Sequence, residues 1–486
     1  MNRLGVLLMG RVILLVGGLQ LIPLGYSLYT GQEETAGEFG ASIMIALLAG
    51  ILLIGRIKEH EDSFSVMEGA KFLFICWWVM AFFGGLPYYL NKELSGVNAI
   101  FDAISCYTTT GVLDLPDTAD KAIILWRSLS QWLGGYMVLL LLTTILPGTS
   151  GCFGTAFVMS GSIRSGAITL RRINRTAAAL MKLYALATLA GIFAFYLLGV
   201  DMFDGANIAL VTISTGGAYV PENQELVVDG RVIMTAMIMM LLMGGNFFMY
   251  WQGMEYQGIR ILKEGWRNSE TRIFLLLVLL VTAIIGLHLW SYGYYDVQDA
   301  FFYTAFHVVS FSCTNGFLIN IIDEWSDVDK FFLSLVALLG GCMGSLAGGF
   351  KIFRLQVMIK SSMAELRRTL HPDMVVHVMI DGRALPQKLI ERVLTYFFMF
   401  FLCLLLSMLV LSLGDLSLQQ TMDMSLACLT STGPMMMFHM ESWQVRQLPD
   451  WIKLYCSLLM VVGKVNIFTF VLLVHSVCSK AGKKRW

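Results

Sequence analysis

The chain carries little charge. Only 14% of its 486 residues are Asp, Glu, Lys or Arg, and its formal net charge is zero. Soluble globular proteins carry roughly 25% charged residues, so this composition does not fit a soluble domain. A zero net charge also lacks the basic excess that nucleic-acid binding needs. We therefore expect no nucleic-acid partner.

The chain also lacks the residue groupings of catalytic and metal sites. Its seven histidines and nine cysteines form no HExxH motif and no Cys/His cluster, so no resident metal site is expected. The odd cysteine count, with most cysteines in apolar segments, argues against a secreted disulfide framework. No nucleophile–base pair is apparent. The sequence thus predicts that the protein is not an enzyme and holds no covalent cofactor.

Apolar residues, by contrast, make up 57% of the chain. A membrane-crossing helix needs about 20 mostly apolar residues. Ten segments approach that length, near 8–29, 39–55, 70–90, 123–147, 177–199, 231–251, 273–292, 331–350, 390–412 and 452–477. Basic residues recur in every second loop between them, starting after the second segment. The positive-inside rule then predicts that both termini are cytoplasmic.

Four shorter apolar segments lie near 98–107, 204–213, 298–312 and 419–430, and each is too short to cross a membrane. Each ends in a polar stretch that contains glycine. We name these stretches the polar loops: Thr108-Thr109-Thr110-Gly111, Ser214-Thr215-Gly216-Gly217, Cys313-Thr314-Asn315-Gly316 and Thr430-Ser431-Thr432-Gly433. Non-helical backbone at membrane depth is tolerated only inside protein or against water. The pattern predicts four re-entrant helices whose loops surround one axis.

The chemistry of these loops suits a monovalent cation. Backbone carbonyls can replace the hydration shell of such an ion without a fixed charge that would trap it. No loop carries an acidic residue at its glycine position, which argues against a carboxylate ring for divalent ions. One Ser/Thr-Gly stretch alone would indicate a helix cap or a polar kink. Four in the same context favour a pore.

A second glycine-rich stretch, which we name the glycine loop, covers residues 340–351. It reads Gly340-Gly341-Cys342-Met343-Gly344-Ser345-Leu346-Ala347-Gly348-Gly349-Phe350-Lys351. Its glycine density should break the expected span, and it lacks the Gly-Lys-Ser/Thr element of a phosphate-binding loop. We expect a flexible intramembrane gate below the polar loops. The alternative is close helix packing through small residues.

Three single residues give further expectations. Lys464 lies inside the last span, where a lysine usually faces a partner, and we expect it to donate to carbonyls of the glycine loop. Asp102 should either add negative potential at the outer mouth or cap its helix. His307 is expected to be structural. The segment 371–386, HPDMVVHVMIDGRALP, is expected to form a turn-rich strand or hairpin.

These motifs resemble those of the Trk/Ktr/HKT superfamily of potassium transporters, most closely its bacterial TrkH/TrkG type. The resemblance covers essentially the whole chain. It rests on Phe101-Asp102-Ala103-Ile104-Ser105 before the first polar loop, Trp126-Arg127-Ser128-Leu129-Ser130-Gln131-Trp132-Leu133-Gly134-Gly135, Ile213 with the second polar loop, Gly244-Gly245-Asn246-Phe247, the glycine loop with Arg354, and Gly433-Pro434.

The resemblance implies an all-α membrane protein in which four pseudo-symmetric helix–pore helix–helix repeats surround one ion pore and follow two extra transmembrane helices. The corresponding divisions are residues 1–62 for the leading helices and 63–150, 151–255, 256–370 and 371–486 for the repeats. It also implies a homodimer in the lipid of a bacterial inner membrane. The usual partner is a cytoplasmic nucleotide-binding subunit of the TrkA/RCK kind.

The resemblance further implies the site residues. K⁺ would bind at filter backbone carbonyls of Thr109, Thr110, Gly111, Thr215, Gly216, Thr314, Asn315, Gly316, Ser431, Thr432 and Gly433. The gate would comprise Gly340, Gly341, Gly344, Ser345, Gly348, Gly349, Lys351 and Lys464.

The sequence departs from the family pattern in the third and fourth loops. It also departs in the last span, where Gly463-Lys464-Val465-Asn466 stands for the usual Gly-Arg-x-Glu. Potassium versus sodium selectivity is left open. So are two other functions: a non-conducting or regulatory paralogue of this fold, and an ion-coupled secondary solute transporter. The latter would want an intramembrane carboxylate, and the spans have almost none.

Overall fold

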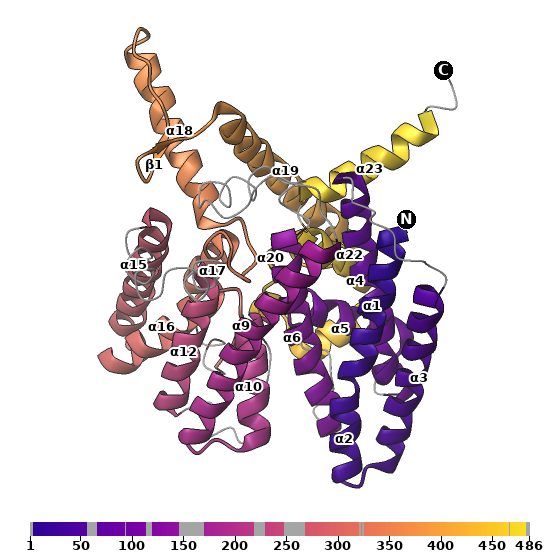
Figure 1. Cartoon of the computed structure of the whole chain (residues 1–486). Helices are drawn as coiled ribbons and strands as arrows, with labels where there is room; N and C mark the ends of the chain where they lie inside the picture. Colours follow the sequence, from indigo (N-terminus) through magenta and orange to yellow (C-terminus); the bar gives the residue numbers. More distant parts are fainter. Residues whose placement is uncertain are drawn as a thin grey trace.

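A computed structural model describes residues 3–55, 66–92, 94–112, 119–144, 170–217, 229–246, 268–319, 322, 325–465 and 467–482. These residues are almost entirely helical (Figure 1). The leading part consists of α1 (Arg3–Leu19), α2 (Leu21–Tyr29) and α3 (Glu33–Gly55).

Long and short helices alternate through the rest of the chain. Four long helices are α4 (Val66–Leu90), α9 (Leu170–Leu197), α15 (Ser269–Ser291) and α19 (Gln387–Leu411). Each is followed by a short helix, namely α5 (Gly96–Tyr107), α10 (Met202–Ser214), α16 (Val297–Ser312) and α20 (Leu418–Thr430). A third set then follows: α6 (Lys121–Thr144), α12 (Gly230–Gly244), α17 (Asp327–Leu339) and α22 (Asp450–Val465). Each short helix packs against the long helix before it and the helix after it.

The short helices lie where the sequence predicts them. They contain 12 to 16 residues, which at about 1.5 Å per residue cannot cross the roughly 30 Å of hydrocarbon. Pairing a crossing helix with a short returning one keeps the backbone hydrogen-bonded at depth. The predicted all-α membrane fold is confirmed.

The surface around this bundle is apolar. Large exposed side chains on the outward sides of the long helices include Leu48 and Leu52 on α3, Leu189 and Phe193 on α9, Leu276 and Leu279 on α15, and Leu405 on α19. Contiguous apolar surface of this extent is unfavourable in water and favourable in lipid. Six helices among the described residues are long and apolar enough to cross a membrane, or seven if one bent pair is a single span. The protein is a multi-pass membrane protein.

Three of the ten expected spans differ from the prediction. The segment 331–350 is not one helix, because α17 ends at Leu339 and the glycine loop follows. The segment 452–477 is divided into α22 and α23 (Ile467–Gly482), which meet at an angle of 112°. The segment 231–251 contains a helix of only 15 residues, α12, among the residues described there. An apolar run therefore indicates which residues lie within the membrane more reliably than it indicates that they form one unbroken helix.

The remaining elements lie outside the bundle core. Helix α18 (Ile352–Leu370) follows the glycine loop and leads to the antiparallel strands β1 (Met379–Ile380) and β2 (Arg383–Ala384). The turn residues Asp381 and Gly382 both have positive φ, as a tight hairpin of this type requires. The hairpin expected within 371–386 is confirmed. Three short elements, η3 (Ser412–Gly414), η4 (Gly433–Phe438) and α21 (Ser442–Gln447), connect the last helices.

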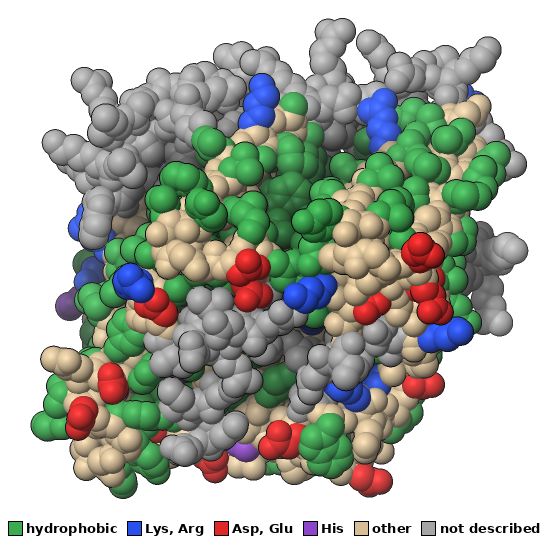
Figure 2. All heavy atoms as spheres, turned by 90° about the horizontal axis from the view of Figure 1, so that it is seen from below, with side chains coloured by type: hydrophobic (Ala, Val, Ile, Leu, Met, Phe, Trp, Pro, Cys, Tyr) green, Lys and Arg blue, Asp and Glu red, His purple; other side chains and the backbone are tan. Residues whose placement is uncertain are grey.

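The two ends of the bundle differ. The turns between α2 and α3 and between α9 and α10 lie at the lower end in Figure 1, whereas α18, the hairpin and the C-terminal end of α23 lie at the upper end. Figure 2 looks onto the lower end and shows acidic side chains spread around it. Exposed acidic residues at these turns include Glu33, Glu34 and Asp201. We name this the lower face. The division boundaries near 62, 150 and 255 fall outside the described residues.

Candidate functional site: the ring of polar loops and the glycine loop

All four short helices end in the same way. The second residue of each polar loop adopts a left-handed conformation, with φ of +52° at Thr109, +56° at Thr215, +54° at Thr314 and +58° at Ser431. Non-glycine residues rarely adopt this conformation, and it persists where surrounding structure enforces it. Four equivalent positions with the same strain indicate four equivalent loops.

The hydrogen bonds after this position also repeat. The third residue of each loop donates its backbone N–H to the carbonyl five residues earlier, which is the pattern of a Schellman helix end. The pairs are Thr110 with Ser105 at 2.8 Å, Gly216 with Val211 at 3.0 Å, Asn315 with Ser310 at 2.8 Å, and Thr432 with Ala427 at 2.9 Å. The donors are thus used within each loop's own helix end.

Neighbouring polar loops touch one another in sequence order. A Cβ added to Gly111 would lie 1.8 Å from the carbonyl oxygen of Gly216, and one added to Gly217 would lie 1.6 Å from that of Asn315. A Cβ on Gly316 would lie 2.8 Å from the ring of Pro434. The contacts therefore run from the first loop to the second, from the second to the third, and from the third to the fourth.

One backbone hydrogen bond closes the ring. Gly433 of the fourth loop donates its N–H to the carbonyl of Thr110 in the first loop at 2.7 Å. The four loops, separated by about a hundred residues each in the sequence, form one continuous ring of main chain. Their polar residues are buried, as the zero exposure of Thr109, Thr215 and Thr314 illustrates.

The filter residues implied by the resemblance leave out Gly217, although it belongs to the second polar loop. Gly217 has a φ of +60° and occupies the place that Gly111 and Gly316 occupy in their loops, with φ of +72° and +70°. Matching the four-residue stretches from their first residue, instead of from their first glycine, would have assigned it. Gly216 instead corresponds to Thr110.

Glycines on the surrounding helices let those helices approach the ring. A Cβ on Gly134 of α6 would lie 2.1 Å from the carbonyl oxygen of Tyr107, and one on Gly463 of α22 would lie 2.5 Å from that of Leu429. Gly244 of α12 likewise lies against Cys313. Any larger residue would push its helix away from the end of a short helix.

The glycine loop lies directly against the third and fourth polar loops. Gly348 donates its N–H to Thr314 Oγ1 at 2.7 Å, and a Cβ on Gly348 would lie 1.9 Å from the carbonyl oxygen of Thr430. Gly340, Gly344, Gly349 and Lys351 all have positive φ. The expected interruption of the helix is confirmed, and the segment is buried along nearly all its length.

Two lysines hold the glycine loop. Lys351 donates through Nζ to Ser345 Oγ at 3.1 Å and to the carbonyl of Ala347. Lys464 donates to the carbonyl of Leu346 at 3.4 Å, which confirms the predicted contact. Lys464 also donates to Thr109 Oγ1 at 2.5 Å. It therefore joins the first polar loop to the glycine loop.

Glu270 is a further contact that sequence reasoning missed. It stands in the first turn of α15, is buried, and accepts a hydrogen bond from the backbone N–H of Met343 in the glycine loop. In the sequence it is one acidic residue at the start of a span. Its partner lies 73 positions away, so no local pattern marks it.

The two expectations for Asp102 were wrong. The residue is fully buried and forms an ion pair with Arg127 of α6 at 3.2 Å, so it neither faces an outer mouth nor caps α5. Arg127 in turn donates to the carbonyl of Val112, just after the first polar loop. Burial of the pair is possible because each charge satisfies the other.

His307 is structural, as expected. Its Nδ1 lies 2.8 Å from the carbonyl oxygen of Tyr303, and its Nε2 accepts the N–H of Ile319 at 3.2 Å. The ring thereby connects α16 to the segment after the third polar loop.

Fold and site together define a multi-pass membrane protein in which four short helices present a closed ring of backbone loops. The chain matches the TrkH family, described as cation transport proteins, over residues 37–481. It therefore belongs to that family, whose members are transporters and not enzymes.

Relatives agree with this assignment. The chain is 28% identical over 479 residues to the Trk system potassium uptake protein TrkH of Escherichia coli K12, covering 96% of this chain and 97% of that one. It is 25% identical to TrkG of the same organism, covering 86% of each. The crystal structure of the potassium transporter TrkH from Vibrio parahaemolyticus superposes with a TM-score of 0.87 at 25% identity, over 97% of this chain and 98% of that one.

Proposed function

We propose that this protein forms the pore of a potassium uptake system and conducts monovalent cations across the bacterial inner membrane. The observation that carries the proposal is the closed ring of four polar loops. A ring built of main chain, without an acidic side chain among its loop residues, offers carbonyl oxygens of moderate field to a dehydrated alkali cation. The names of the relatives, potassium uptake proteins, favour K⁺ as the cargo.

The filter in this proposal consists of the loop residues named from the sequence, with Gly217 added. The short helices end at the ring, so the negative ends of their dipoles are directed toward a bound cation. Na⁺ would compete with K⁺ for this site, and the rigidity of the spacing between the loops would determine how strongly it competes.

The glycine loop is the gate. It packs against the ring at Gly348 and is held there by Lys351, Lys464 and Glu270. Opening a path past it requires these contacts to break. Because glycine is conformationally permissive, the segment can rearrange with little backbone penalty.

The assembly in this proposal is a homodimer with one pore in each protomer and both termini in the cytoplasm. A cytoplasmic nucleotide-binding subunit of the TrkA/RCK kind would dock on the basic cytoplasmic segments. The exposed Arg367, Arg368 and Arg383 near α18 and the hairpin supply positive charge for such contacts.

The test is cation flux through the purified protein in lipid vesicles. We expect uptake of rubidium-86 along its gradient, competed by K⁺ more strongly than by Na⁺. Growth of a potassium-uptake-deficient bacterium at low potassium with this chain expressed gives the cellular counterpart. A folded protein that supports neither flux nor growth, even with a nucleotide-binding partner present, would instead be a non-conducting paralogue. Uptake that requires a second solute would indicate a coupled transporter.

A further inference from the structure

The fourth polar loop is held differently from the first and third. In the first, Ser105 Oγ accepts the N–H of Val112 at 2.7 Å, and in the third, Ser310 Oγ donates to the carbonyl of Phe317 at 3.0 Å. These serines occupy the same place in α5 and α16, five residues before the third residue of the loop. The corresponding residue of α20 is Ala427, which has no hydroxyl. The fourth loop therefore lacks this clamp to its own helix.

A cluster of polar side chains anchors the outer end of the fourth loop instead. The loop continues as the 3-10 helix η4, which ends at Phe438. Lys330 of α17, nearly buried, donates to the carbonyl of Phe438 at 3.2 Å. Gln420 of α20 donates to the carbonyl of His439 at 3.1 Å. These bonds fix the main chain at the end of η4.

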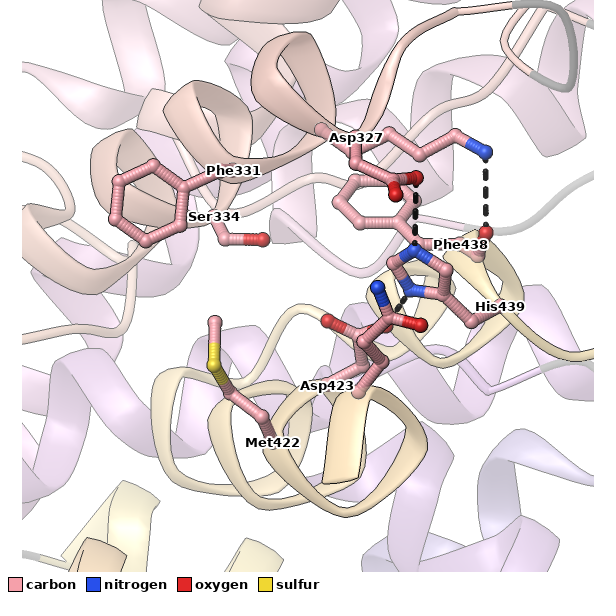
Figure 3. A pocket seen from close by; sticks show the side chains of 9 residues that line it. Asp327, Phe331, Ser334, Met422, Asp423, Phe438 and His439 are labelled. Carbon is pink, nitrogen blue, oxygen red and sulfur yellow. Dashed lines mark hydrogen bonds and ion pairs between the residues drawn. The ribbon is translucent and has the colours of Figure 1, made fainter. Parts of the chain in front are cut away.

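The side chain of His439 adds two contacts to carboxylates (Figure 3). Its Nδ1 lies 2.5 Å from Asp423 Oδ2 on α20, and its Nε2 lies 3.4 Å from Asp327 Oδ1 on α17. Together with Lys330 these residues line a cavity of about 220 Å³ between α17, α20 and η4. The imidazole thus bridges the helix before the glycine loop and the helix before the fourth polar loop.

This bridge needs a proton beyond those of a neutral imidazole. Ionised carboxylates only accept hydrogen bonds, and a neutral imidazole has one N–H. Both contacts are hydrogen bonds only when the trio of His439, Asp327 and Asp423 holds one further proton. Histidine is the side chain whose charge ordinarily changes between about pH 5 and 8. Without that further proton, one of the two contacts has no donor.

Among the residues that the structure describes, the charged groups facing His439 are Asp327 and Lys330 from α17 and Asp423 from α20. Phe311 of α16 contributes an aromatic contact to Phe438. A second pair at the same end of α17, His288 with Asp329 at 3.1 Å, joins α17 to α15 and touches no polar loop. It offers a matched control.

We propose that Lys330, Asp423 and His439 are positioning residues for the fourth polar loop, and that the proton shared by His439 with the two aspartates makes ion selectivity respond to pH. This inference rests on the proposed function of the ring as a filter. In this proposal, residues outside the ring control the position of one of its four loops.

The test is the ratio of rubidium to sodium uptake in vesicles, measured with equal pH on both sides between about pH 5.5 and 8.5. We expect the wild-type ratio to fall by about threefold or more with rising pH, because one charge-assisted hydrogen bond is lost. His439→Gln retains an amide but removes the imidazole, so its ratio should depend on pH clearly less than the wild-type ratio does. His288→Gln should follow the wild-type curve.

Substitutions of Lys330 provide an independent test. Lys330→Met should lower the ratio at every pH, and Lys330→Arg should restore most of it, a rescue that a purely space-filling role would not produce. Size-exclusion profiles verify that each variant is folded. The proposal is overturned if His439→Gln keeps the wild-type pH curve, or if folded Lys330→Met keeps the wild-type ratio. A wild type without any flux would overturn both this inference and the proposed function, whereas flux with an unaltered His439→Gln curve overturns this inference alone.

Discussion

Lys464 of α22 donates a hydrogen bond to Thr109 Oγ1 at 2.5 Å, although 355 residues separate the two in the chain. Thr109 is the left-handed residue at the end of α5, and the same ammonium group also reaches Leu346 in the glycine loop. A single half-buried cation is thus shared between the first polar loop and the proposed gate.

Removing that cation should loosen the gate. Lys464→Ala deletes both hydrogen bonds, and losing bonds of this type shifts an equilibrium by about tenfold or more. We expect a higher open probability in single-channel recordings and faster rubidium-86 uptake. Lys388→Ala, at an exposed position in the first turn of α19, is the control. An unchanged open time in Lys464→Ala would argue against a latch.

The closeness of the polar loops predicts a steric effect at Gly217. Gly217→Ala places a Cβ 1.6 Å from the carbonyl oxygen of Asn315, so the second and third loops must separate. We expect rubidium uptake to fall by about tenfold or more, because a shift of this size in a binding geometry is costly. Gly111→Ser and Gly433→Ser should act likewise at their own contacts.

Gly31→Ala separates this clash from backbone strain. Gly31 also has positive φ, +75°, but has open space around its Cβ position. Both substitutions incur a backbone cost of about 1 kcal/mol, so only the clash differs. Equal uptake in the Gly31 and Gly217 variants would show that the loop spacing does not matter.

The hydroxyl of Thr314 connects the ring to the glycine loop. Thr314→Ala removes the acceptor that holds the Gly348 N–H at 2.7 Å, whereas Thr314→Ser keeps it. A buried N–H left without a partner costs about 1–3 kcal/mol, so the glycine loop should leave this position more often. We expect a larger conductance or open probability in the alanine variant and near-wild-type behaviour in the serine variant. Identical records from the two would contradict the contact's role.

The buried ion pair behind the first loop predicts a stability effect. Asp102→Asn leaves Arg127 buried with an uncompensated charge, which costs about 3–5 kcal/mol. We expect a clearly lower Tm in detergent. The double variant Asp102→Leu with Arg127→Met should recover part of the loss, because it removes both charges. Asp299→Asn, at an exposed site in the first turn of α16, should leave the Tm unchanged, and a Tm in Asp102→Asn equal to that control would refute the pairing argument.

The sequence predicted the short helices and the break at the glycine loop, because the length of an apolar segment and its glycine density are properties of neighbouring residues. The partner of Asp102 was not foreseen, since Arg127 lies 25 positions away and only packing of α6 on α5 brings it near. The same holds for Glu270 and the glycine loop, and for the bridge from His439 to Asp327 across 112 positions. The division of the last span between α22 and α23 falls just after Gly463 and Lys464, a polar interruption from which we predict a hydrogen-bonding position and not a helix break.

The hydrogen bond from Gly433 to Thr110 has an evolutionary consequence. Because a single polypeptide supplies all four polar loops, one codon change alters one loop only. In a symmetric tetramer the same change would be imposed four times at once. If the ring is the proposed filter, discrimination among alkali ions can therefore drift in small steps, and the dissimilar residues Thr110, Gly216, Asn315 and Thr432 at one equivalent position are what such independent drift would leave behind.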